Sequence, residues 1–261
     1  MSKACVLIAS AFLLAFAACK SNPNAPSSAV PAGTPAPIAS PETIDQFKVL
    51  LFADQSLEEI TKSVDTSSSA SASPPWSLFA SALAASRQGN SEEAKNNLKQ
   101  VLAMPGGESR VQLWAWKALR ELREEPARDI ADKVQGVVCE LHNQAGVGTM
   151  AAYADGRARW VDGEGNVIGW EAPGDDAEIN GLVGELLRSS EPLVRTAPLY
   201  DKHKTPEPPL DHFRVSILTF GGIRVVEVFG PEIDEGHPVA PVLTTSAKLV
   251  DALAKKSEKP K

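Results

Sequence analysis

The chain has 261 residues, of which 43% are hydrophobic, and this fraction is ample for a packed core. Its formal net charge is −7, with no basic block before the last residues, which argues against binding nucleic acid or an anionic membrane through charge. The three cysteines are too few for a disulfide-rich scaffold.

The chain begins with a pattern typical of a secretory signal. A single cation precedes the apolar run Ala4–Ala18, which is too short for a comfortable membrane span. The run ends in the sequence FAAC at positions 16–19, which resembles the lipobox of bacterial lipoproteins. Residues 1–18 are therefore predicted to be a signal peptide, and Cys19 to become the lipidated first residue. The alternatives are an ordinary signal peptide cut nearby or an uncleaved anchor.

Residues 19–43 are rich in Pro, Ala and Ser and show no apolar period, so they are predicted to form a tether. Lys20, rather than Asp, follows the cysteine, which favours the outer membrane in a cell that has two membranes. The expected location is the bacterial cell envelope, with the protein facing the periplasm and contacting the membrane through its lipid anchor at Cys19.

Residues 44–133 are predicted to form a helical domain, because apolar residues recur there at the helical period in four segments. The segment from Leu78 to Leu102 resembles one tetratricopeptide-type helix pair, and a plain antiparallel bundle is the alternative. Helix starts are predicted from three caps, namely Ser56 with Glu59, Asn90 with Glu93, and Ser109 with Gln112.

Trp116 lies off the apolar stripe that Trp114 anchors in the fourth of these helices. A tryptophan outside the stripe either packs on the neighbouring domain or contacts a partner, and tryptophan is enriched among binding hot spots. Trp116 is therefore a candidate partner contact.

Residues 134–256 are predicted to form an α+β domain, and 257–261 a basic tail. The order of elements is four strands, a helix, two strands and a helix. This order indicates an antiparallel sheet of about six strands with two helices on one face. Asp175 is predicted to cap the first of these helices, and Gly221-Gly222 to form the turn of the second hairpin.

The strongest turn signal is Asp155-Gly156, because Asp and Gly tolerate the positive φ that a two-residue type I′ turn requires. Arg157 and Arg159 then lie together on the mixed face of the hairpin. They could hold a carboxylate or a phosphate by paired hydrogen bonds, and a solvated outer face is the alternative. The pairs predicted on the apolar face are Tyr153 with Ala158 and Ala151 with Trp160.

Known catalytic and cofactor patterns are absent from the sequence. The stretch Asp162–Asn166 starts like a calcium loop but lacks the later ligands, so an ordinary turn is expected. Cys139 alternates with apolar neighbours and is predicted to be a buried thiol. The four histidines, at positions 142, 203, 212 and 237, are scattered. No catalytic residue, cofactor or metal is predicted.

Several blocks together resemble an uncharacterised family of bacterial proteins. The longest is AAYADGRAR at 151–159, and the resemblance covers roughly residues 77–253. The family has no known activity, so the resemblance implies no catalytic residues. The other blocks are Pro105-Gly106, Glu108-Ser109-Arg110, Trp116–Arg120, Gly136-Val137-Val138, Trp170-Glu171, Leu218-Thr219 and Gly221-Gly222.

Three hypotheses follow for the function. The first is a lipid-anchored interaction or accessory protein, not an enzyme, that binds another protein of the envelope. The second is a sensor whose sheet holds a small molecule, as profilin-like sensory domains do. The third is an enzyme without a familiar motif.

Overall fold

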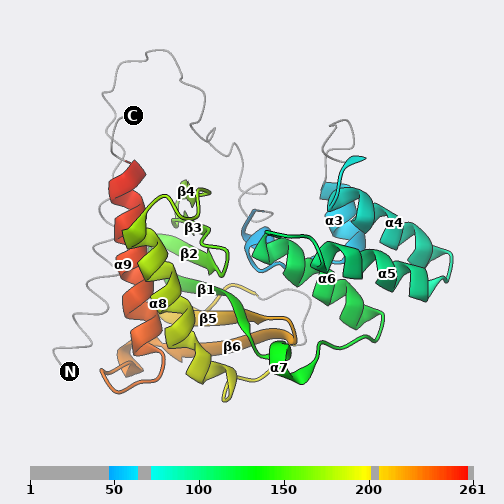
Figure 1. Cartoon of the computed structure of the whole chain (residues 1–261). Helices are drawn as coiled ribbons and strands as arrows, with labels where there is room; N and C mark the ends of the chain where they lie inside the picture. Colours follow the sequence, from blue (N-terminus) through cyan, green and yellow to red (C-terminus); the bar gives the residue numbers. More distant parts are fainter. Residues whose placement is uncertain (1–46, 64–71, 201–205, 258–261) are drawn as a thin grey trace, which may run out of the picture.

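The computed structural model describes residues 47–63, 72–200 and 206–257; Cys19, the signal sequence and the tether lie outside these ranges. The fold is α+β, as predicted. A set of helices comes first, followed by a six-stranded antiparallel sheet with the helices α8 and α9 packed on it (Figure 1). Among the described helices, none combines the length and apolarity that a membrane crossing requires.

The helical region begins with a helical stretch at 47–51. The predicted caps at Ser56 and Asn90 are confirmed: Glu59 N donates to Ser56 Oγ at 3.3 Å, and Glu93 N donates to Asn90 Oδ1 at 3.4 Å. The helices that follow are α3 (Leu57–Ser63), α4 (Trp76–Arg87), α5 (Ser91–Leu102), α6 (Ser109–Glu121) and the short α7 (Arg128–Ala131).

The sheet has the strand order β4-β3-β2-β1-β5-β6, and every neighbouring pair is antiparallel. The first four strands form a meander, and the last two return to pair with β1, so that β2 and β1 lie at the centre. The bounds are β1 (Val134–Asn143), β2 (Gly146–Tyr153), β3 (Ala158–Val161), β4 (Val167–Trp170), β5 (His212–Thr219) and β6 (Gly222–Phe229).

The predicted register of the central hairpin is wrong by one residue. Its loop has three residues, because Gly156 N donates to Tyr153 O at 2.9 Å and Tyr153 N donates to Arg157 O at 2.9 Å. Gly156 takes φ +87°, as expected of a type I turn closed by a left-handed residue. The observed pairs are Ala152 with Ala158, Ala151 with Arg159 and Met150 with Trp160.

Gly156→Val should lower the free energy of unfolding by about 1–3 kcal/mol, because a β-branched residue is strained at positive φ. A Cβ at this position would also lie 2.9 Å from the Cβ of Pro173. Denaturant unfolding of the two chains measures the difference. Gly174→Val is a matched control, since Gly174 has φ +97° but no atom within 4 Å of the added carbon. Equal losses in the two variants would assign the whole effect to backbone strain.

Because a strand alternates its faces, the corrected register separates Tyr153 from Trp160. Trp160 lies with Met150 and Cys139 in the core between the sheet and the helices α8 (Ala177–Val194) and α9 (Ala240–Ser257). Tyr153 lies in a second core between the sheet and the N-terminal helices. Both faces of the sheet are therefore covered, one by α8 and α9, as predicted, and the other by the N-terminal helices.

Three smaller predictions are also corrected. Residues Phe220-Gly221 turn the second hairpin, one position before the predicted pair, because Thr219 is in register with Gly222. Asp176, not Asp175, caps α8 and accepts hydrogen bonds from Glu178 N and Ile179 N at 2.9 and 3.1 Å. The third concerns Ser109, which does not cap α6.

Candidate functional site

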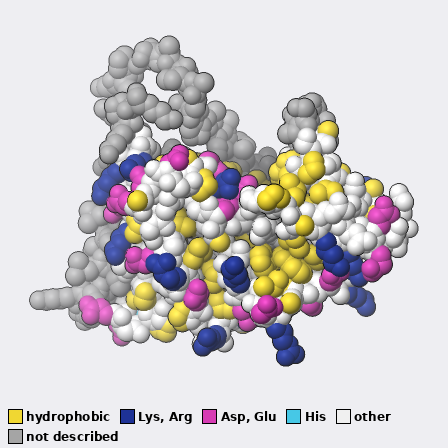
Figure 2. All heavy atoms as spheres, viewed as in Figure 1, with side chains coloured by type: hydrophobic (Ala, Val, Ile, Leu, Met, Phe, Trp, Pro, Cys, Tyr) yellow, Lys and Arg dark blue, Asp and Glu magenta, His cyan; other side chains and the backbone are white. Residues whose placement is uncertain are grey.

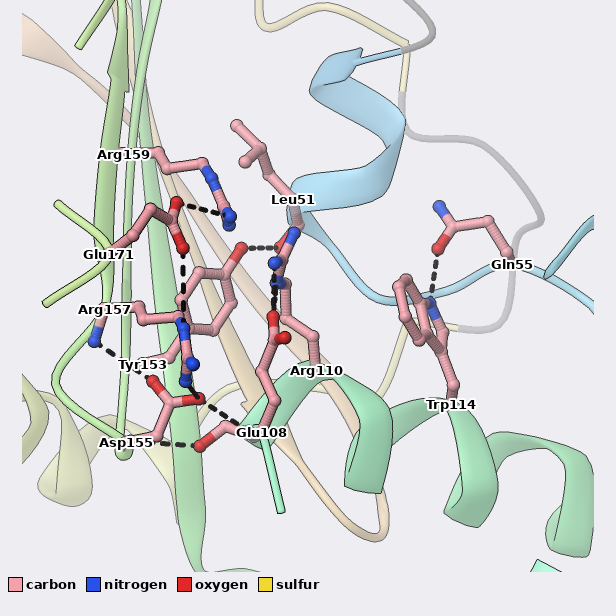
Figure 3. A network of polar contacts seen from close by, with 11 residues as sticks. Leu51, Gln55, Glu108, Arg110, Trp114, Tyr153, Asp155, Arg157, Arg159 and Glu171 are labelled. Carbon is pink, nitrogen blue, oxygen red and sulfur yellow. Dashed lines mark hydrogen bonds and ion pairs between the residues drawn. The ribbon is translucent and has the colours of Figure 1, made fainter. Parts of the chain in front are cut away.

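The N-terminus of α6 meets the turn between β2 and β3 (Figure 3). Ser109 was predicted to cap α6, but it is the first helical residue and Asp155 takes the capping role from the sheet. Ser109 N donates to Asp155 Oδ2 at 2.7 Å, and Asp155 N donates to Ser109 Oγ at 3.1 Å. A carboxylate at a helix N-terminus is favourable, so this exchange fixes α6 on the hairpin.

The candidate residues Arg157 and Arg159 lie beside this cap and share one carboxylate. Glu171, which follows β4, contacts Arg157 Nε at 3.4 Å and Arg159 Nη2 at 2.5 Å (Figure 3). Arg157 also contacts Asp155 Oδ2 at 3.0 Å. The two arginines therefore belong to an internal ion network. Their binding of an external carboxylate or phosphate stays a prediction.

Arg159 is on the sheet face that the helical region covers, and its side chain is only 12% exposed. Burial lowers its pKa, and the nearby cation Arg110 lowers it further, while Glu171 opposes both effects. The Nη1 atom of Arg159 is buried without a hydrogen-bond partner in the described chain. The corrected register explains this environment, because it places Arg159 on the face of Tyr153.

Hydrogen bonds across the second core join the helical region to the sheet. Tyr153 Oη donates to Leu51 O at 2.7 Å, and burial raises the pKa of this phenol (Figure 3). Arg110 of α6, paired with Glu108, lies over the Tyr153 ring at 5.5 Å from its centroid. These contacts bury Tyr153 completely, and they hold the helical region against the sheet at this junction.

Trp116 packs on the tip of the β5–β6 hairpin. Its ring centroid lies 5.9 Å from that of Phe220, and the ring is partly buried against the second core. Arg120, one turn further along α6, donates to the backbone oxygen of Phe220. Of the two roles considered for Trp116, the structure supplies a contact for internal packing, and a contact with a partner stays a prediction.

A second polar cluster, which the sequence analysis missed, crosses the sheet on the same face. Glu140 of β1 is in register with Thr149 of β2 and Arg214 of β5, and Arg214 is in register with Glu227 of β6. Glu140 and Arg214 are 6% and 5% exposed. The strand period alone does not show that distant segments cover Glu140.

The other candidate residues do not come together in a site within the described ranges. Cys139 is 1% exposed, as predicted, and burial raises the pKa of its thiol to about 12. In the turn after β3, Asp162 Oδ1 accepts from Glu164 N and Asn166 N at 2.9 and 2.8 Å, which is the expected ordinary turn. Within the described ranges no three His, Cys, Asp or Glu residues are placed to hold a metal ion. His203 lies outside those ranges.

Comparison of the chain with protein-family models, with curated proteins and with solved structures gives no match. The resemblance to an uncharacterised bacterial family therefore stays a prediction.

Proposed function

We propose that the chain is a lipid-anchored protein of the bacterial cell envelope that acts as a protein-interaction or accessory module. The observation that carries the proposal is the N-terminal pattern: an apolar run ending in FAAC at 16–19, followed by a Pro/Ala/Ser-rich tether. Such a tether is long enough to hold a folded domain away from a membrane surface.

The surface around α6 supports an interaction role. Figure 2 shows hydrophobic side chains gathered where α6 and α7 lie beside the tip of the β5–β6 hairpin. Partly buried hydrophobic residues of this region include Trp116, Leu122, Ile130 and Ile223. Contiguous apolar surface that remains partly exposed is typical of protein–protein contact sites. The same surface contains the tryptophan that the sequence analysis selected.

The charged groups favour binding over chemistry. A catalyst needs a nucleophile or an acid–base pair that can reach a substrate. Arg157, Arg159 and Glu171 are instead paired with one another, and Cys139 is buried with a raised pKa. This arrangement supports a structural or binding role for these residues.

Cys19→Ser should release the protein from the membrane fraction and abolish its labelling by palmitate. The physical reason is that the acyl chains supply the membrane affinity, since the remaining chain is acidic. Fractionation of cells grown with a clickable palmitate analogue measures both effects. Cys139→Ser is the matched control and should keep the label and the membrane location. Unchanged fractionation of the Cys19 variant would contradict the anchor.

Cross-linking in intact cells, followed by isolation of the tagged chain, tests the interaction role. We expect one envelope protein to be recovered with the wild type and to rebind the purified chain directly. Failure of every recovered protein to rebind would contradict the module. Turnover of a substrate by the purified chain, lost on changing one ionisable residue without unfolding, would favour an enzyme instead.

A further inference from the structure

One oxygen of a buried carboxylate on β1 lacks a hydrogen-bond partner among the described residues. Glu140 is 6% exposed, and its Oε2 atom accepts no hydrogen bond there. The cation beside it is Arg214, whose Nη1 atom lies 3.7 Å from Glu140 Oε2. This separation allows an ionic attraction but is longer than a hydrogen bond.

The donors of Arg214 are directed to other acceptors. Its Nε and Nη2 atoms donate to Glu227 Oε2 at 3.0 and 2.6 Å. Its Nη1 atom donates to the backbone oxygen of Pro206, in the segment that leads into β5. Arg214 Nη1 thus lies between two acceptors, the Pro206 carbonyl, which it bonds, and the Glu140 carboxylate, which it does not.

We propose that Glu140 is a proton-binding residue whose protonation controls how tightly residues 206–211 dock on the sheet. When Glu140 is neutral, Arg214 Nη1 stays on the Pro206 carbonyl. When Glu140 is ionised, its charge attracts the guanidinium toward Oε2 and weakens the bond that holds the segment. The proposal is independent of the lipid anchor and of the interaction role.

The segment is docked on β1 next to Glu140 by two further contacts. Asp211 N donates to the backbone oxygen of His142 at 2.8 Å, and the His142 ring Nδ1 lies 2.7 Å from Pro208 O. Pro208 is buried, although its neighbours in the segment are exposed. The segment therefore helps to exclude water from this part of β1, and its release would hydrate the carboxylate.

The charged groups facing Glu140 come from four elements: Arg214 of β5, Lys48 of the helical stretch 47–51, Glu207 of the docking segment and Glu227 of β6. Burial is the main cause that raises the pKa of Glu140, to about 7; Arg214 and Lys48 lower it, and Glu207 and Glu227 raise it.

Release of residues 206–211 would hydrate Glu140, remove Glu207 and free a donor of Arg214. All three changes lower the pKa of Glu140, so the docked state binds the proton more tightly. Lys48 does not alter this sign, because it is bonded to Val147 O on β2 and not to the segment.

The sign of the pH dependence follows from these shifts. Between the ordinary pKa of 4.5 and the docked pKa of about 7, the docked state holds a proton that the released state has lost. Docking is therefore tightest at low pH and weakens as the pH rises through this window. If release restores the ordinary pKa completely, the opening equilibrium constant increases by about tenfold from pH 6 to pH 8.

Amide hydrogen exchange in the full chain, followed by NMR, tests the proposal. The amides of Asp211 and His212 report on the segment, because both are hydrogen bonded: Asp211 N to His142 O, and His212 N to Pro209 O at 3.1 Å. After correction for intrinsic exchange, their protection should fall by up to about tenfold between pH 6 and pH 8. Glu140→Gln, neutral at every pH, should show equal protection at both values.

Glu191→Gln, an exposed change on α8, is the control and should keep the wild-type pH dependence. Equal protection of the wild type at both pH values would overturn the proposal. Retained pH dependence in Glu140→Gln would show that another group causes the effect and would also overturn the proposal. If Glu140→Gln fails to fold, a pH titration of the side-chain carboxyl resonance of wild-type Glu140 tests the proposal instead. We expect a midpoint near pH 7, and a midpoint near pH 4.5 would contradict the proposal.

Discussion

Arg214→Leu should lower the free energy of unfolding by about 3–5 kcal/mol at pH 8, because it leaves the buried Glu140 carboxylate without its cation. Arg214 is 5% exposed and contacts Glu140 at 3.7 Å and Glu227 at 2.6 Å. Urea unfolding measures the loss. At pH 5.5 the loss should be smaller, because Glu140, with a pKa of about 7, is then mostly protonated and carries no unpaired charge.

Two further variants serve as controls for Arg214→Leu. Arg188→Leu changes an exposed arginine of α8 and should stay within about 0.5 kcal/mol of the wild type. Glu140→Gln combined with Arg214→Leu should be less destabilised at pH 8 than the sum of the single changes, because the two residues interact. Strict additivity, or an equal loss at both pH values, would mean that Glu140 and Arg214 are not coupled.

Trp116→Ala should lower the free energy of unfolding by about 3 kcal/mol, since it removes a large ring that packs on Phe220 at 5.9 Å between centroids. The ring lies where α6 contacts the tip of the β5–β6 hairpin, so its removal weakens the junction between the helices and the sheet. Denaturant unfolding monitored by circular dichroism avoids the change in tryptophan fluorescence.

Leu210→Ala is the control for Trp116, because Leu210 is 51% exposed and should cost about 0.5 kcal/mol or less. Unchanged stability of Trp116→Ala, together with loss of the cross-linked envelope protein, would show that Trp116 contacts a partner and not the interior. A loss of stability alone would restrict Trp116 to internal packing.

Local signals predicted much of the fold. The order of strands and helices after residue 134 follows from hydrophobic period and turn residues, and the structure confirms it. The caps at Ser56 and Asn90 were predictable because each partner is three residues away. Burial of Cys139 was predictable too, because the strand period placed it among apolar residues.

Register could not be predicted in the same way. Asp155-Gly156 suits a two-residue loop and also the last two positions of a three-residue loop, and the two differ by one residue in pairing. That single residue decides which face Trp160 and Arg159 occupy. Only the assembled sheet, in which Ala152 pairs with Ala158, selects between them.

By itself, the sequence determined the succession of elements, the α+β class and the buried thiol, since these depend on residues near one another in the chain. The tertiary structure alone decided that Asp155 caps α6 across 46 positions, and that Glu140 is buried beside Arg214. Such contacts join segments distant in sequence, and their energies depend on burial and dielectric surroundings that exist only after the sheet is covered on both faces.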